Sequence, residues 1–221
     1  LATGDVVQDL PDHENGVSVL ALGASTIATA STGEKVNDSP ANFKLRIWDM
    51  GAKSAEIMDH GGSIRGLSLL GNGSTSGFIS CSNDGGVKIR SLNGAEYGTV
   101  VHDPQADGTL PLVLACAGLK NATQTEFVSG AEDGSCFVWE GTNRRQNLAH
   151  PSTVWCICPL ENGDFVTGSE DGVLRVFSRS ETWQSIAGAD ARMVKLSDDV
   201  EAVKAARRAR SAPSASDVAK Y

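Results

Sequence analysis

The sequence predicts an all-β protein built from a repeated unit of roughly 40 residues. A short string recurs three times, as Ser80–Gly85 leading to Arg90, Ser129–Gly134 leading to Trp139, and Thr167–Gly172 leading to Phe177. A degenerate copy lies upstream, where Ile27–Ser31 is followed by Leu45–Asp49. Around these strings, short apolar or alternating runs are bounded by Gly, Asn, Asp and Ser, which is typical of strands and turns. This texture excludes helical repeats.

The spacing of the copies identifies the repeat. Asp84 and Asp133 are 49 residues apart, and Asp133 and Asp171 are 38 apart. These values bracket the roughly 40–45 residues of a four-stranded WD40 blade. We therefore predict a WD40 β-propeller region over residues 1–185, with blades near 10–58, 59–99, 100–148 and 149–187. Four blades are expected to form an open arc, or a fragment of a ring, with apolar faces exposed at both ends.

Residues 188–221 break from the repeat. The apolar residues between Met193 and Val203 fall at near-helical spacing. Two aspartates follow Ser197 and the basic run Arg207–Arg210 comes late, which suits the dipole of a helix that begins near Ser197. We predict a short helix and then a linker toward a further domain. The basic run is read as a solvated helix end, with a nuclear signal as the alternative.

Composition and charge favour a soluble protein that binds other proteins. The 221 residues include 24 glycines and carry a formal net charge of −8. No run approaches the roughly 20 apolar residues of a membrane span, so no membrane insertion is expected. The acidic balance argues against nucleic acid as a partner. The first residues do not resemble a signal peptide and lack an initiating Met, so we expect a fragment or a processed piece.

The five cysteines indicate a reducing compartment. Each lies in an apolar, strand-like run: Cys81, Cys116, Cys136, Cys156 and Cys158. We expect buried free thiols, since unpaired Cys behaves as a small hydrophobe. A metal or redox site is the alternative, but the Cys-x-Cys spacing at 156–158 lacks the tighter turn usual in zinc sites. No metal and no cofactor is predicted.

Each copy contains residues that commonly brace a WD40 blade, in which a Trp N–H reaches a Ser or Thr, the hydroxyl reaches a His, and the His reaches an Asp. The second blade offers His60, Ser80 and Asp84, with Arg90 in place of Trp. The third blade offers Ser129, Asp133 and Trp139, with His102 further away. The last blade offers His150, Thr167 and Asp171, with Phe177 in place of Trp. The first blade keeps His13, Thr29 and Trp48. Such groups would pair one another when buried.

The same residue types could indicate a hydrolase. A nucleophile needs an exposed hydroxyl beside an oxyanion hole. Here the combination recurs blade after blade, as bracing would and a single active site would not. No nucleophile elbow and no phosphate-binding loop is found in the sequence. We therefore predict no enzymatic activity and no catalytic residue.

Several segments resemble the later blades of the phospholipase A-2-activating protein family. They are Ile64–Leu67, Phe78–Asp84, Val154–Val166 and Asp171–Phe177, the last with Val-Phe where other blades have Trp-Asp. The resemblance covers about residues 13–180. It implies an N-terminal seven-bladed propeller, of which this chain would hold roughly blades four to seven, followed by a ubiquitin-binding domain and a C-terminal helical domain that this chain lacks.

The resemblance implies a ubiquitin-binding adaptor. Its expected partners are ubiquitin or ubiquitinated proteins and, through the C-terminal domain, the AAA ATPase valosin-containing protein. The implied processes are ubiquitin recycling and ubiquitin-dependent sorting or degradation, in the cytoplasm and also in the nucleus. The alternative is a WD40 interaction scaffold of other specificity, similar to G-protein β subunits. An enzyme framed on a propeller is the rival from another class.

The partner surface is predicted at the start of each innermost strand, where side chains crowd around the central channel. The position after the first apolar residue of that strand is occupied by Ser18, Arg65, Leu114 and Trp155. Trp and Arg are frequent hot-spot residues, so Trp155 with Arg65 is the expected ubiquitin contact. The alternative is that Trp155 packs against a neighbouring blade. The acidic body suits the basic rim of ubiquitin's apolar patch.

Two insertions depart from the family pattern, around residues 33–42 and 103–109. Both are polar and contain Pro or Gly. They are expected to be surface loops, which a blade tolerates. The alternative is that they enlarge a partner surface.

Overall fold

Within the part of the chain that it describes, the computed structural model consists of β-strands and turns. The described residues are 9–10, 13, 16–23, 25–32, 43–49, 52–58, 60–71, 77–120 and 125–178. The predicted helix near Ser197, the linker after it, the insertion at 33–42 and the end of the last predicted blade lie outside these residues. Among the described residues, no helix has the length and apolar character needed to cross a bilayer.

The described strands form four antiparallel sheets in which each strand pairs with its neighbour in sequence. Sheet A contains β1 (Val17–Ala21), β2 (Thr26–Ser31), β3 (Lys44–Asp49) and β4 (Ala52–Met58). Sheet B contains β5 (Ile64–Leu70), β6 (Gly77–Ser82), β7 (Gly86–Ser91) and β8 (Glu96–Val101). Sheet C contains β9 (Val113–Gly118), β10 (Glu126–Ala131), β11 (Cys136–Glu140) and β12 (Asn143–Asn147). Sheet D contains β13 (Val154–Pro159), β14 (Phe165–Ser169) and β15 (Leu174–Phe177).

The repeated Asp-Gly string forms the hairpin between the second and third strands of sheets B, C and D. Its glycine has positive φ in each case: Gly85 at 82°, Gly134 at 87° and Gly172 at 75°. The aspartate before it accepts a hydrogen bond from the backbone N–H two residues on, at 2.9 Å in sheets B and C and 3.1 Å in sheet D. This turn chemistry explains why the string recurs with each sheet.

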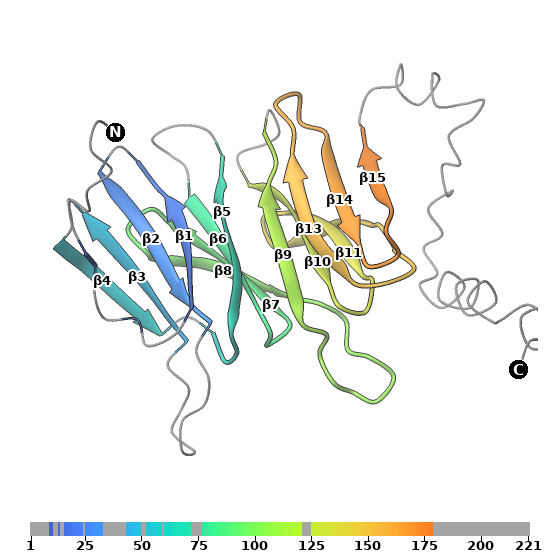
Figure 1. The fold of residues 1–221 in the computed structure, drawn as a ribbon, viewed down its shortest axis with the longest axis horizontal. Helices are drawn as coiled ribbons and strands as arrows, with labels where there is room; N and C mark the ends of the chain where they lie inside the picture. Colours follow the sequence, from blue (N-terminus) through green and yellow to red (C-terminus); the bar gives the residue numbers. More distant parts are fainter. Residues whose placement is uncertain are drawn as a thin grey trace, which may run out of the picture.

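The four sheets lie in a row, and the first strand of each contacts the first strand of the next (Figure 1). β1 lies against β5, β5 against β9, and β9 against β13. Sheets A and D are at opposite ends of the row (Figure 1). The expected open arc and all-β class are thus what the structure shows.

The hydrophobic core is divided into layers between neighbouring sheets. Leu45 and Ile47 of sheet A pack with Ile64 and Phe78 of sheet B. A second layer joins sheets B and C, and a third joins sheets C and D. Every sheet between two others therefore has two buried faces, which is why the strands are rich in Ile, Val, Phe and Ala rather than strictly alternating.

Candidate functional site: buried histidine networks and an inner-strand surface

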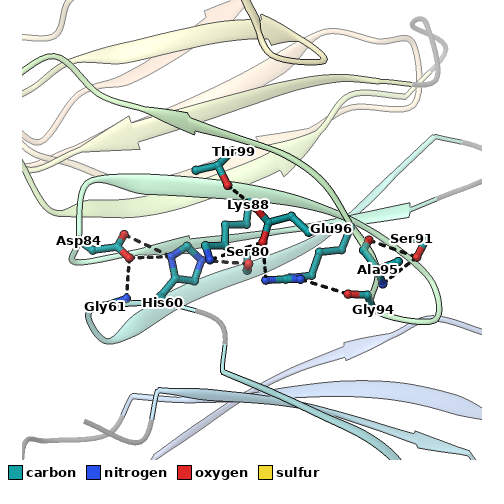
Figure 2. A network of polar contacts seen from close by, with 11 residues as sticks. His60, Gly61, Ser80, Asp84, Lys88, Ser91, Gly94, Ala95, Glu96 and Thr99 are labelled. Carbon is teal, nitrogen blue, oxygen red and sulfur yellow. Dashed lines mark hydrogen bonds and ion pairs between the residues drawn. The ribbon is translucent and has the colours of Figure 1, made fainter. Parts of the chain in front are cut away.

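In sheet B, His60 connects the β6 hydroxyl to the turn aspartate. Its Nε2 shares a 3.0 Å hydrogen bond with Ser80 Oγ, and its Nδ1 lies 2.9 Å from Asp84 Oδ2 (Figure 2). The Asp84 carboxyl also accepts hydrogen bonds from the N–H groups of Gly61 and Gly86. Burial opposes its ionisation, but the hydrogen bond and charge of His60 and these two N–H groups hold the pKa of Asp84 well below its usual range.

Arg90 occupies the position of the expected Trp in sheet B. Its guanidinium is buried, yet it donates to the Gly94 carbonyl at 3.1 Å and to Glu96 Oε2 at 3.2 Å. Lys88 lies 3.6 Å from the same carboxylate. A buried charge is tolerated only when it is paired, and the Arg90–Glu96 pair meets this requirement at the outer edge of the sheet.

In sheet C, five side chains form a directed chain of hydrogen bonds. Trp139 Nε1 donates to Ser129 Oγ at 2.8 Å, and Ser129 Oγ lies 2.7 Å from His102 Nε2. His102 Nδ1 lies 2.8 Å from Ser135 Oγ, which donates to Asp133 at 2.6 Å. Since Trp can only donate and a carboxylate can only accept, the chain is consistent when His102 is neutral and carries its proton on Nδ1.

This arrangement differs from the common pattern, in which the histidine reaches the turn aspartate directly. Ser135, two residues after the aspartate, is the link that the sequence prediction missed. The signal was present in the sequence, because a Ser at this place in an Asp-Gly-Ser turn can reach both the aspartate and the histidine. Burial lowers the pKa of His102 to about 4.

In sheet D, the predicted contact between His150 and Asp171 is not formed. His150 Nε2 shares a 2.7 Å hydrogen bond with Thr167 Oγ1, whereas its Nδ1 donates to the Leu148 carbonyl at 2.9 Å. Asp171 is instead paired with Arg175, four residues later, at 2.5 Å. Burial opposes ionisation of Asp171, but Arg175 and the Ser169 hydroxyl lower its pKa to about 2. The guanidinium therefore takes the place that the histidine was expected to fill.

Sheet A contains the network of the degenerate first copy. Trp48 Nε1 donates to Thr29 Oγ1 at 2.8 Å, and the same oxygen lies 2.6 Å from His13 Nε2. Arg46 contacts the other ring nitrogen of His13 at 2.8 Å. Thus each sheet joins a histidine to a hydroxyl on its second strand.

These histidine networks stabilise the sheets, and their buried hydroxyl groups are not placed to act as nucleophiles. The hydroxyl-bearing residues Ser80, Ser129 and Thr167 are fully buried, and so is His150. A hydroxyl that no substrate can reach does not serve as a nucleophile. Each histidine instead ties the segment before a sheet to the middle of that sheet, and satisfied buried polar chains of this kind rigidify a core.

The inner strands β5, β9 and β13 each contain a β-bulge near their start. The register skips one residue between Ile64 and Gly66, between Val113 and Ala115, and between Val154 and Cys156. The extra residues are Arg65, Leu114 and Trp155, which we call the bulge surface. A bulge re-aims the side chain of its extra residue, and bulges are frequent next to functional sites.

The bulge surface combines an aromatic, an aliphatic and a cationic side chain on three neighbouring strands. Trp155 is 58% exposed, Arg65 is exposed and Leu114 is half-buried. Arg65 Nε donates to Asn83 Oδ1 at 2.8 Å, which fixes its direction. An exposed Trp is unusual in a β-sheet protein unless it contacts a partner, because Trp contributes large apolar area to an interface.

Ser18 does not share this geometry. Sheet A has no bulge at that place, since Val17 pairs with Ser31 and Ser18 pairs with Ala30 in continuous register. By this register Ser18 occupies the position that Gly66, Ala115 and Cys156 occupy in the other sheets, and not the position of the bulged Arg65. Sequence spacing placed it correctly along the strand, but only hydrogen-bond register distinguishes a bulged residue from a paired one.

The backbone of two acidic residues is hydrogen-bonded to the segment that leads into the bulge at Trp155. Glu132 and Glu170 each precede the turn aspartate of sheets C and D. The Glu132 carbonyl accepts from Thr153 Oγ1 at 2.8 Å, and the Glu170 N–H donates to the Thr153 carbonyl at 2.9 Å. Both therefore lie beside Thr153, two residues before Trp155. Sequence reasoning missed them, although their position just before each Asp-Gly pair was a usable signal.

The cysteines are only partly as expected. Cys81 and Cys136 are buried and Cys116 is half-buried, but Cys156 and Cys158 are exposed. The expectation of burial is wrong for this last pair, because their face of sheet D is not covered by another described sheet. Burial raises the pKa of the Cys136 thiol. Within the described residues, no group of three or more His, Cys, Asp or Glu is placed to hold a metal ion.

The second insertion is a surface loop in the structure. Residues 103–110 are mostly exposed, and a tight turn closes with Gln105 N–H donating to the Thr109 carbonyl at 2.7 Å. Asp107 caps this turn by accepting from Thr109. The loop is therefore ordered by its own short-range hydrogen bonds.

Comparison with known proteins supports the fold and the family resemblance. Residues 142–178 match the family model "WD domain, G-beta repeat". The ubiquitin homeostasis protein lub1 of Schizosaccharomyces pombe is 33% identical over 123 residues, which are 55% of this chain and 16% of lub1. The phospholipase A-2-activating protein of Xenopus laevis is 57% identical over 28 residues, which are 13% of this chain and 4% of that protein. The chain thus spans a small part of these relatives.

Two solved structures share the fold. The WD40 β-propeller domain of Doa1 superposes with a TM-score of 0.62 at 24% identity, covering 78% of this chain and 54% of that one. The computationally designed Ika4 protein superposes with a TM-score of 0.59 at 22% identity, covering 79% of this chain and 98% of Ika4. These matches confirm the predicted propeller architecture. The chain is therefore a portion of a WD40 β-propeller whose sequence is similar to the phospholipase A-2-activating protein family.

Proposed function

We propose that this chain is the ubiquitin-binding propeller portion of an adaptor in ubiquitin-dependent protein turnover. The observation that carries the proposal is Trp155, a large aromatic side chain that is the extra residue of a β-bulge in the inner strand β13 and is 58% exposed. The similarity to a ubiquitin homeostasis protein supports the choice of partner. The role is binding, with no catalytic step assigned to the chain.

The bulge surface is chemically suited to ubiquitin. Ubiquitin's binding patch is apolar and bordered by basic residues. Trp155 and Leu114 offer apolar contact area, and Glu132 and Glu170, whose backbone groups are hydrogen-bonded to Thr153, are the acidic residues of this region. Aromatic anchors provide most of the affinity at such interfaces, whereas border charges chiefly raise the association rate.

The finer parts of the role follow from the family resemblance. It assigns the link to the AAA ATPase valosin-containing protein to a C-terminal domain, so none of the described sheets is proposed to bind that ATPase. It also implies action in the cytoplasm and the nucleus, in recycling, sorting or degradation.

Titration of the 221-residue chain with mono-ubiquitin, followed by isothermal calorimetry, tests the proposal. Trp155→Ala should weaken binding by roughly 30-fold, the effect of a central hot spot. Tyr97→Ala is the matched control, because Tyr97 is a 72% exposed aromatic on the outer strand β8 and its loss should change affinity less than twofold. Absence of ubiquitin binding by the unaltered chain, or equal affinity of the two variants, would overturn the proposal and favour a scaffold of other specificity.

A further inference from the structure

Two cysteines from different sheets meet between sheets B and C. Cys81 lies on β6 and is fully buried, whereas Cys116 lies on β9 and is half-buried. Gly66 of β5 is the register partner of Cys81. A Cβ atom added at Gly66 would lie 3.2 Å from Cys81 Sγ and 3.6 Å from Cys116 Sγ. Both sulfur atoms therefore border the small space that Gly66, which has no side chain, leaves open.

The inner strands β5 and β9 approach each other closely at this place. A Cβ added at Gly66 would lie 3.8 Å from the backbone nitrogen of Cys116, and a Cβ added at Gly118 would collide with the Leu69 carbonyl oxygen. Stacked sheets are ordinarily about 10 Å apart, whereas the two Cα atoms of a disulfide are usually less than about 7 Å apart. The glycines at 66 and 118 allow the closer approach that a bond between the sheets requires.

The two thiols are chemically unequal. A hydrogen bond with Cys116, together with burial, raises the pKa of the Cys81 thiol. Cys81 therefore keeps its proton and donates it toward the Cys116 sulfur, which stabilises a thiolate at Cys116. The thiolate is the form of cysteine that attacks an oxidant, and Cys116 is also the member of the pair that is partly exposed. Cys116 is thus the thiol that reacts first.

We propose that Cys81 and Cys116 are an oxidation site at which hydrogen peroxide forms a disulfide between sheets B and C. The Cys116 thiolate attacks one peroxide oxygen, so that an S–O bond forms and the O–O bond breaks. The departing hydroxide takes up the proton that Cys116 had given to solvent. The Cys81 sulfur then attacks the Cys116 sulfenic acid, so that the S–S bond forms, the S–O bond breaks, and hydroxide leaves as water with the Cys81 proton. The two thiols lose two electrons, and the peroxide is reduced to two molecules of water.

The disulfide would lie close to the bulge surface and within the row of sheets. Gly66 follows Arg65 in the chain, and Cys116 is two residues after Leu114. The bond would close a segment that includes all of β7 and β8. A cross-link of this kind restricts the unfolded chain, so the melting temperature should rise by roughly 5–10 °C on oxidation. The proposal does not depend on ubiquitin binding.

Peptide mapping of the 221-residue chain without reductant tests the site. The protein is treated with hydrogen peroxide, its remaining thiols are blocked with iodoacetamide during unfolding, and trypsin is added. Cleavage after Lys and Arg places Cys81 in the peptide 66–88 and Cys116 in the peptide 91–120, and neither peptide contains another cysteine. These two peptides should be recovered joined to each other, from protein that migrates as a single chain in a non-reducing gel.

Single substitutions separate this site from the other thiols. Cys116→Ser and Cys81→Ala should each abolish the joined peptides and the rise in melting temperature. Cys136→Ala is the matched control, because Cys136 is also fully buried but burial alone raises its pKa. Both effects of oxidation should persist in that variant and in the double variant Cys156→Ser, Cys158→Ser.

Three results would overturn the proposal. The first is recovery of Cys81 as a free thiol while Cys116 is oxidised to the sulfinic acid. The second is joined peptides that occur only in dimers of two chains, and the third is a melting temperature that oxidation leaves unchanged.

Discussion

Acidification from pH 7.5 to 5.0 should destabilise this protein through two buried histidines. Burial lowers the pKa of both His102 and His150 to about 4, from the 6.5 of an ordinary histidine. The unfolded chain therefore binds protons at a higher pH than the folded chain. The contribution of these two neutral histidines to the free energy of unfolding is fully present above pH 6.5 and is lost progressively as the pH falls toward 4.

The magnitude follows from the linkage relation. At pH 5, a shift from 6.5 to about 4 costs about 2 kcal/mol of unfolding free energy for each histidine, hence about 4 kcal/mol for both. This is a large share of the roughly 5–15 kcal/mol that stabilises a typical domain. The structural cause is specific: a proton on His102 Nε2 would oppose the Ser129 hydroxyl, whose own proton would then lose its acceptor.

Urea unfolding monitored by tryptophan fluorescence at the two pH values measures this loss. His102→Gln keeps a hydrogen-bonding side chain but does not titrate, so its loss between pH 7.5 and 5.0 should be smaller by about 2 kcal/mol. Asp84 and Asp171, whose pKa values are lowered, contribute stability that is lost only below the usual carboxylate range, outside this window. Equal pH dependence in the variant and the unaltered chain would refute the reasoning.

Two further substitutions test the packing between and within sheets. Trp139→Phe removes the 2.8 Å hydrogen bond to Ser129 while keeping an aromatic ring, and should cost about 1–2 kcal/mol in urea unfolding; an unchanged midpoint would contradict the bracing role. Gly118→Ala would place a Cβ 1.9 Å from the Leu69 carbonyl oxygen of the neighbouring sheet. It should cost about 1–3 kcal/mol or more, measured by thermal melting, whereas Gly23→Ala meets nothing within 4 Å and serves as the control.

The histidine networks show where sequence reasoning succeeds and where it stops. The pairing of Ser80 with His60 and of Thr167 with His150 could be predicted, because both partners recur at similar places in each copy. The second partner of each ring could not. Ser135 in sheet C and the Leu148 carbonyl in sheet D take the place of the turn aspartate at the histidine, and only the three-dimensional path of the chain brings them there.

The bulge surface shows a similar division. The positions of Arg65, Leu114 and Trp155 along their strands were predictable from the apolar pattern. Their bulged conformation was not, because a bulge is a property of two paired strands and not of one. Ser18 has the same place in the pattern and no bulge, and only the register with β2 reveals this.

The sequence by itself determined the local structure: strands of four to seven residues, Asp-Gly turns, and a repeat length typical of a WD40 blade. These depend on neighbours in the chain, so pattern and turn chemistry suffice to predict them. The tertiary structure decided which faces are covered. Cys136 and Leu174 occupy equivalent places in sheets C and D, yet the first is buried and the second is 73% exposed. The physical reason is that burial requires a following sheet, which is a property of the assembled row and not of the strand.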